Sequence, residues 1–244
     1  MDFWKEVADS YASNKDVFLL GENEDKDFLE AGHFNCFYAW AFVDELKKIV
    51  QENESISSID SYLAKNVGTD NRLRIYYTSN HDENSWQGTV FERLGEGHKA
   101  FAVLGATIDG MPLLYSGQEA ATKKRIKFFE KDPIEWGDYV YADLYKTLFQ
   151  LKKKNKALWN GSYGGDLVKI PTNKPEDIYA FSREKNGDKV VVILNLSGVR
   201  QNVTLEGDDF VGSYNNVFAN GTMNLSANMT MELPAWDYIV LSNK

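Results

Sequence analysis

The sequence of 244 residues contains a single cysteine, Cys36, so no disulfide can form within the chain. No apolar run approaches the roughly 20 residues that a helix needs to span a bilayer, and we expect no membrane partner. Acidic residues outnumber basic residues. With 36 Asp and Glu against 27 Lys and Arg, the formal net charge is −9. Such a surface repels phosphate backbones, so we also expect no nucleic-acid partner.

Several patterns that carry chemistry are also missing. Cys and His do not occur at metal-ligand spacing, so we expect no metal site in this chain. There is no glycine-rich phosphate loop, and neither a serine nucleophile elbow nor a Cys–His pairing stands out. Aromatic side chains are abundant, at 14% of residues. They suit a buried core most often, and the flat faces of sugar rings in some proteins.

The first two-thirds of the chain alternates strand-like and helix-like patterns. Short apolar runs predict strands, and apolar residues at helical spacing follow them, so we expect parallel strands joined by helical crossovers. The predicted strands cover 16–20, 33–40, 72–80 and 111–117, and the predicted helices cover 2–13, 40–52, 55–67, 97–109 and 141–159.

The pattern changes near 161–165, where short strands and turn signals begin. Asn186-Gly187-Asp188 lies between two alternating runs and predicts a hairpin. We expect an antiparallel β-sandwich here. The predicted domains are therefore 1–163, which is α/β, and 164–244, which is all β.

Two predicted strands end in carboxylates. Glu22 follows "FLLG" and Asp82 follows "YYTSNH". Because ligands bind at the carboxyl ends of parallel strands, we expect both side chains on one face. Paired carboxylates suit the cleavage of glycosidic bonds. The alternative is that both carboxylates cap helices or are simply solvated.

Four segments resemble the α-amylase superfamily, glycoside hydrolase family 13, in the family's order. They are "DVFLLGENED" (strand 5), "IYYTSNHDENSW" (strand 7), "GMPLLYSGQE" (strand 8) and "IKFFEKDPIEW" with the helix after it. The resemblance is closest to α-amylase or neopullulanase-like members. It implies the C-terminal half of a (β/α)8 barrel, strands 5–8 with their helices, followed by a β-sandwich, and it implies an α-glucan as substrate.

The resemblance also implies roles for individual residues. Glu22 matches the general acid/base, and Asp82 matches the carboxylate that binds sugar hydroxyls and stabilises the transition state. His81 matches a histidine that hydrogen-bonds sugar hydroxyls, and Asn80 supports it. Weaker substrate-binding candidates near the rim of the site are Trp86, Tyr115 and Gln118.

The family is retaining and needs a nucleophilic Asp, which lies in a Gly-Phe-Arg-x-Asp type of motif. That motif does not occur in this sequence, and most of the calcium ligands that the family uses are absent too. We therefore expect no cofactor in this chain and no appreciable activity from the chain alone. The alternative function is a non-catalytic, amylase-like carbohydrate-binding or scaffolding protein.

A half-barrel leaves its first and last strands as open edges. We expect either pairing of two chains through these edges, giving a homodimer, or a rearrangement in which the β-sandwich covers part of the sheet.

Overall fold

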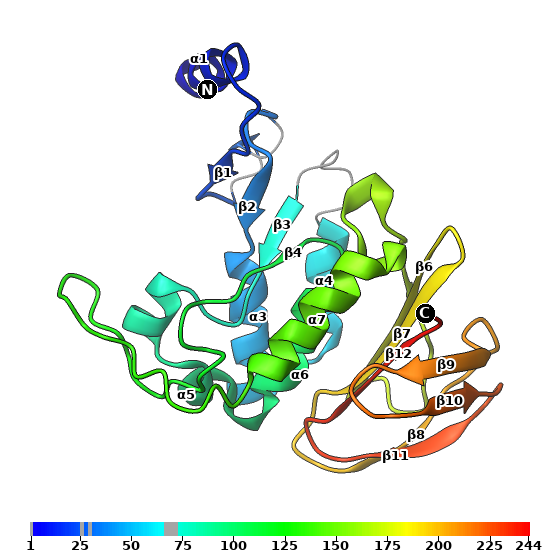
Figure 1. The fold of residues 1–244 in the computed structure, drawn as a ribbon. Coiled ribbons are helices and arrows are strands. Elements are labelled where there is room, and N and C mark those ends of the chain that lie inside the picture. The colour runs from blue at the N-terminus through cyan, green and yellow to red at the C-terminus, as the bar shows by residue number, and fades with distance from the viewer. Residues whose placement is uncertain (1, 25–26, 29–30, 66–72) are drawn as a thin grey trace.

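The computed structural model describes residues 2–24, 27–28, 31–65 and 73–244 (Figure 1). Its first part is a parallel sheet in the order β1-β2-β3-β4, with helices between β2 and β3 and between β3 and β4. The fold is half of a (β/α)8 barrel, as the sequence predicts. The strands are β1 (Leu20–Gly21), β2 (Cys36–Tyr38), β3 (Leu73–Tyr76) and β4 (Met111–Pro112).

The helices pack their apolar faces on one side of this sheet. In α3 (Trp40–Gln51) the side chains of Phe42, Leu46 and Ile49 are buried at helical spacing, which confirms the helix predicted over 40–52. The other helical segments are α1 (Asp2–Ala12), α4 (Ser57–Lys65), η1 (Glu83–Gln87), α5 (Val90–Leu94), η2 (Gly95–Gly97), α6 (His98–Thr107), α7 (Ala142–Lys154), η3 (Lys156–Leu158) and η4 (Gly161–Tyr163).

All four strands are shorter than predicted, and the two outer strands are the shortest. The runs 33–40 and 72–80 form strands only at Cys36–Tyr38 and Leu73–Tyr76, and residue 72 lies outside the described residues. The runs 16–20 and 111–117 form ladders only at Leu20–Gly21 and Met111–Pro112. Among the described residues, β1 pairs only with β2 and β4 only with β3. A strand with a neighbour on one side has half the ladder hydrogen bonds of a central strand, so a short regular segment is the result.

The second part is antiparallel. A six-stranded sheet runs β10-β9-β12-β7-β6-β5, and β11 pairs with β8 beside it. Asn186 and Gly187, with φ of 53° and 83°, turn the chain between β6 and β7, which confirms the predicted hairpin. The strands are β5 (Leu167–Lys169), β6 (Ile178–Lys185), β7 (Asp188–Asn195), β8 (Gln201–Thr204), β9 (Gly212–Asn216), β10 (Thr222–Leu225), β11 (Thr230–Leu233) and β12 (Tyr238–Ser242).

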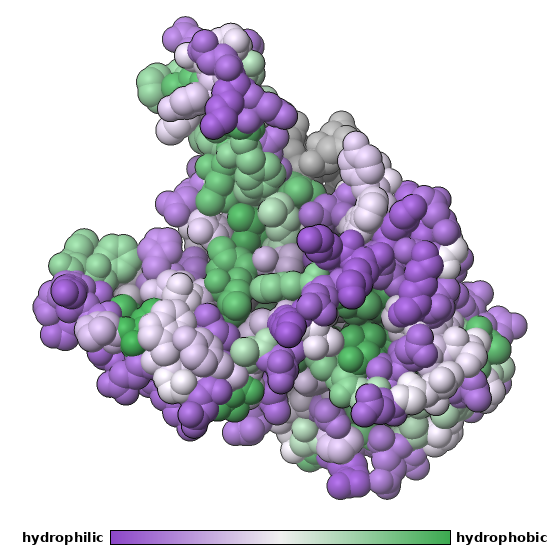
Figure 2. All heavy atoms as spheres, in the orientation of Figure 1, coloured by the Kyte–Doolittle hydropathy of each residue, from purple (hydrophilic) through white to green (hydrophobic). Residues whose placement is uncertain are grey.

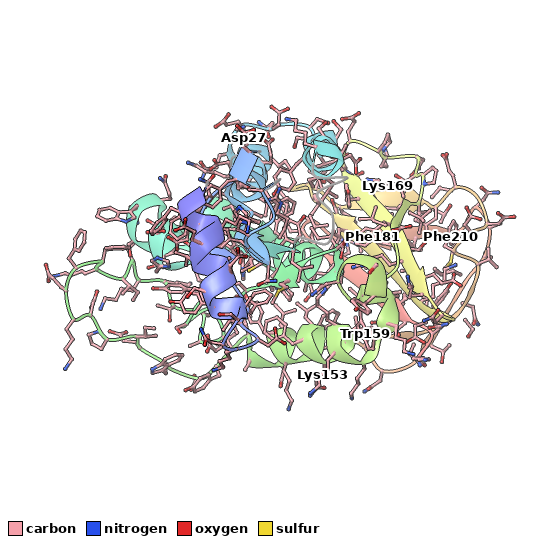
Figure 3. All side chains as sticks on the ribbon, turned by 90° about the horizontal axis from the view of Figure 1, so that it is seen from above. Asp27, Lys153, Trp159, Lys169, Phe181 and Phe210 are labelled. Atoms are coloured by element: carbon pink, nitrogen blue, oxygen red, sulfur yellow. The ribbon has the colours of Figure 1, made fainter. Side chains whose placement is uncertain are left out.

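The two parts share one hydrophobic core. Phe181 and Val192 of the six-stranded sheet belong to the same buried cluster as Phe42 and Leu104 of the helices. Figure 3 shows Phe181 on the side of the sheet that faces the helices and Phe210 on the far side, where a second cluster lies. The β domain thus packs on the helical layer and forms a separate sheet from β1–β4. The boundary at residue 163 stays a prediction.

None of the described helices is long and apolar enough to cross a membrane.

Candidate active site

Glu22 and Asp82 lie beyond the C-terminal ends of β1 and β3, at the same edge of the parallel sheet. Tyr38, the last residue of β2, lies between these two strands. Burial raises the pKa of the Tyr38 phenol, and the negative charges of Glu22 and Asp82 raise it further. The fold therefore places these two predicted residues at the same edge of the sheet, after the strands on either side of β2.

His81 lies beside Asp82, with 3.5 Å between His81 Nε2 and Asp82 Oδ2. Both side chains are partly exposed, 47% for His81 and 38% for Asp82, so they can reach a ligand in solvent. The His81 ring also stacks on Phe128, with centroids 5.9 Å apart and planes inclined by 28°. An imidazole held in this way can donate or accept a hydrogen bond to a sugar hydroxyl.

Asn80 is buried and starts the turn that follows β3. Its Oδ1 accepts a hydrogen bond from the backbone N–H of Glu83 at 2.8 Å, and its carbonyl accepts one from the N–H of Asn84. The chain then winds as the π-helix η1, a rare conformation that is frequent at functional sites. Asn80 thereby positions His81 and Asp82 at the start of this winding. This geometry fits the supporting role that the resemblance implies.

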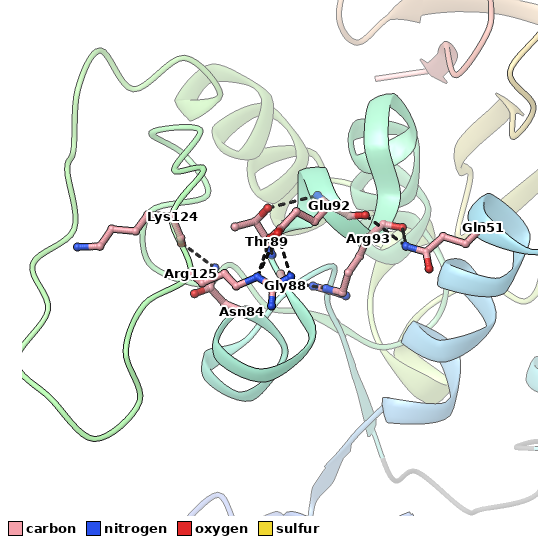
Figure 4. Close-up of polar contacts among 8 residues, drawn as sticks. All are labelled: Gln51, Asn84, Gly88, Thr89, Glu92, Arg93, Lys124 and Arg125. Atoms are coloured by element: carbon pink, nitrogen blue, oxygen red, sulfur yellow. Dashed lines mark hydrogen bonds and ion pairs between the residues drawn. The ribbon is translucent and has the colours of Figure 1, made fainter.

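A buried ion pair that sequence reasoning missed lies beneath His81 and Asp82. Arg93 Nη1 lies 3.4 Å from Glu83 Oε2, and the same guanidinium donates to the carbonyl of Thr78 at 2.6 Å. It also donates to the carbonyl of Gly88 at 2.9 Å, as Figure 4 shows. Burial raises the pKa of the Glu83 carboxyl, and Arg93 opposes that rise. Arg93 thus joins the end of β3 to both ends of η1.

Glu24, also missed, anchors the segment that carries Glu22. Its Oε2 accepts a hydrogen bond from the N–H of Ala41 at 2.7 Å, and its Oε1 accepts one from the Tyr62 hydroxyl at 3.2 Å. A carboxylate at the N-terminus of α3 also interacts favourably with the helix dipole. Burial raises the pKa of the Glu24 carboxyl, and these hydrogen bonds oppose the rise. The acidic string "GENED" was the only sequence signal for this anchor.

The three weaker candidates occupy different environments. Trp86 lies on η1 and is 56% exposed. Gln118 is buried, and its Nε2 donates to Thr78 Oγ1 at 2.8 Å and to the Tyr145 hydroxyl at 3.3 Å. Gln118 Oε1 accepts from the N–H of Tyr115 at 2.9 Å. Gln118 therefore holds the turn after β4 onto the sheet, while Trp86 is available to a ligand.

In the described part of the chain, no three His, Cys, Asp or Glu side chains gather in a way that could hold a metal ion. The chemistry considered for this site involves protein side chains only, without calcium or another cofactor.

Comparisons with known proteins agree with the fold and the sequence motifs. Residues 178–240 match a family model described as the alpha-amylase SusG C-terminal domain. The chain is 25% identical over 249 residues to the alpha-amylase MalA of Haloarcula japonica, an alignment that covers 96% of this chain and 36% of MalA.

Solved structures share the architecture of the whole chain. The noncanonic maltogenic alpha-amylase AmyB from Thermotoga neapolitana superposes with a TM-score of 0.81 at 18% identity, covering 99% of this chain and 58% of AmyB. The alpha-amylase GTA from Geobacillus thermoleovorans, solved with acarbose, gives a TM-score of 0.79 at 18% identity and covers 99% and 56%. The chain spans about a third of MalA and somewhat more than half of these solved amylases. The match to the β-domain model and the relationship to MalA support a likeness of this chain to the C-terminal region of α-amylases, and the solved amylases share its fold.

Proposed function

We propose that this chain carries the acid/base half of a retaining α-glucan hydrolase site, and that it binds α-glucans without hydrolysing them on its own. The observation that carries the proposal is that Glu22 and Asp82 follow two strands of one parallel sheet and lie at the same carboxyl edge of it. In this function His81 and Asp82 hydrogen-bond the hydroxyls of one sugar ring, and Glu22 faces the glycosidic oxygen. Trp86 and Tyr115 line the rim of the site. Gln118 supports the site indirectly, because its side chain holds the turn at Tyr115 in place.

The test is calorimetric titration of the purified chain with maltoheptaose. His81→Ala and Asp82→Ala each remove hydrogen-bonding groups from the site, one of them charged, so each is expected to weaken binding by about tenfold or more. Asp208→Ala is the matched control, because it removes an exposed carboxylate from the β domain. Both site variants should remain folded, since His81 and Asp82 are partly exposed.

Two outcomes contradict the proposal. Absence of heat at millimolar maltoheptaose would mean that the chain does not bind α-glucans. Binding that is unchanged in Asp82→Ala and His81→Ala would place the glucan elsewhere. That second result would favour the alternative function, a non-catalytic carbohydrate-binding or scaffolding protein.

The open sheet edges support a partner proposal as well, the pairing of two chains. Figure 2 shows apolar atoms gathered below α1 and over β1 and β2, where the exposed side chains include Phe3, Phe18 and Leu20. Monomers rarely leave contiguous apolar surface of this kind uncovered, and an unpaired edge strand is a template for association.

We expect the mass from light scattering to rise with concentration. Leu20→Lys, which puts a charge on the edge strand β1, should abolish the rise, whereas Val199→Lys at an exposed β-domain position should not. A strictly monomeric wild-type chain across concentrations would exclude pairing.

A further inference from the structure

Three exposed aromatic rings extend the surface around His81. They are Trp86 on η1 together with Phe128 and Phe129 on the loop 123–137, which projects from the molecule between β4 and α7 (Figure 1). We call these three residues the aromatic platform. Phe128 contacts the candidate site through its stacking on the His81 ring.

The rings of the platform contact one another. Phe128 and Phe129 have centroids 4.8 Å apart, and Trp86 lies 5.3 Å from Phe128 and 6.0 Å from Phe129. The rings nevertheless remain open to solvent, with exposures of 56% for Trp86, 41% for Phe128 and 85% for Phe129. Through the stacking of Phe128 on His81, the platform is continuous with the site.

The amide of Asn84 fixes the loop against η1. Asn84 Oδ1 accepts from the N–H of Ile126 at 2.7 Å, and its Nδ2 donates to the carbonyl of Lys124 at 3.3 Å. Next to it, the Ser85 hydroxyl donates to the Ile126 carbonyl at 2.6 Å. These three hydrogen bonds hold the loop two residues before Phe128 against the residues that precede Trp86.

A second anchor joins the same loop to α5 (Figure 4). Arg125 donates to both carboxylate oxygens of Glu92, at 2.8 Å from Nη2 and 3.0 Å from Nε. Glu92 also accepts from the N–H of Thr89 at 2.7 Å and completes the capping box of α5. Gly88 leaves room for this junction, because a Cβ there would lie 3.0 Å from both Arg125 and Glu92.

The chemistry of the platform suits an uncharged ligand with a flat apolar face. Three of the five basic side chains of the loop 123–137 are in ion pairs: Lys124 with Asp132, Arg125 with Glu92 and Lys127 with Glu130. The pairs leave the rings as the main recognition elements of this surface. A pre-positioned aromatic ring loses little conformational entropy when a ligand stacks on it.

We propose that the aromatic platform is an additional α-glucan subsite, on which the apolar face of a pyranose ring stacks against Phe129 and Trp86 while a neighbouring ring reaches His81 and Asp82. This subsite rests on the function proposed above, because its occupant is the same glucan chain. The path from His81 through Phe128 to Phe129 makes one continuous surface, which matches a ligand that is itself a chain of rings.

The test is calorimetric titration of the whole chain with maltoheptaose. Phe129→Ala removes a ring that is 85% exposed, so the fold has little reason to change, and we expect the Kd to rise by roughly threefold to tenfold. Phe129→Tyr keeps the ring and should stay within about twofold of wild type. The matched control is Tyr163→Ala, which removes an aromatic ring on η4 that is 75% exposed, and its Kd should equal that of wild type.

Titrating His81→Ala as well distinguishes a failure of the subsite from a failure of the proposed function. If His81→Ala weakens binding and Phe129→Ala does not, the subsite is absent and the proposed function stands. If the wild-type chain does not bind maltoheptaose, the proposed function fails and the subsite fails with it. If Phe129→Ala instead abolishes self-association in light scattering and leaves the Kd unchanged, the platform binds a second copy and the proposal is overturned.

Discussion

Replacing Arg183 by Met is expected to lower the free energy of unfolding by about 3 kcal/mol or more, because it leaves several buried carbonyls without their donor. The Arg183 side chain is fully buried on β6. It donates to the carbonyls of Thr107 at 3.1 Å, Trp159 at 2.9 Å and Gly165 at 2.7 Å. These carbonyls belong to the end of α6, the turn after η3 and the segment before β5. One side chain thus ties the half-barrel to the β domain.

Urea denaturation followed by circular dichroism measures this loss. Arg200→Met is the matched control. Arg200 pairs with the carboxylate of Glu232 at 2.9 Å, and both side chains are more than 60% exposed. Its expected cost is about 0–1 kcal/mol. Equal costs for the two variants would show that Arg183 does not join the two parts.

The loss of unfolding free energy in Arg183→Met should also depend on pH, because the charge of Arg183 affects the pKa of Lys152. Burial and then the charge of Arg183 lower the pKa of Lys152 to about 7. In the wild-type chain the unfolded state binds more protons than the folded state above that pKa, so stability rises as pH increases from about 7 toward 10.5. Arg183→Met removes a neighbouring positive charge and raises the pKa of Lys152, so it reduces this gain. The destabilisation should therefore be larger at pH 9 than at pH 6.

The isolated chain is expected to hydrolyse starch about 10⁶-fold more slowly than an enzyme with a complete retaining site, the scale seen when a covalent nucleophile is removed. In the retaining reaction a carboxylate attacks the anomeric carbon while the acid gives its proton to the departing oxygen. In the proposed function Glu22 supplies that proton. The Gly-Phe-Arg-x-Asp motif that would supply the attacking carboxylate does not occur in the sequence. On this proposal we expect no glycosyl–enzyme bond to form in the isolated chain.

The sequence predicted the parallel sheet and its helices well, because strands covered on both faces are short apolar runs and their helices show regular spacing. It predicted the lengths of the strands less well, because all four predicted runs are longer than the strands that form. For the two outer strands, pairing on one side limits the ladder to Leu20–Gly21 and Met111–Pro112. Composition alone does not contain that information.

The site was predictable where strand ends determine it and unpredictable where long-range contacts do. Glu22 and Asp82 were predicted to lie at one edge of the sheet because parallel strands align their carboxyl ends, and the structure places both there. The π-helix after β3 depends on Asn84 bonding to a loop some 40 residues away, which no local pattern reveals. For the same reason Phe128 and Phe129 had no visible connection to Trp86 in the sequence.

The most direct test of the central claim measures reducing-sugar release from soluble starch by the purified chain, beside its titration with maltoheptaose. The account predicts that wild type binds the oligosaccharide and releases no reducing sugar above the level of Glu22→Gln. Clear release by wild type that Glu22→Gln abolishes would contradict it, because the chain would then hold a complete hydrolytic site.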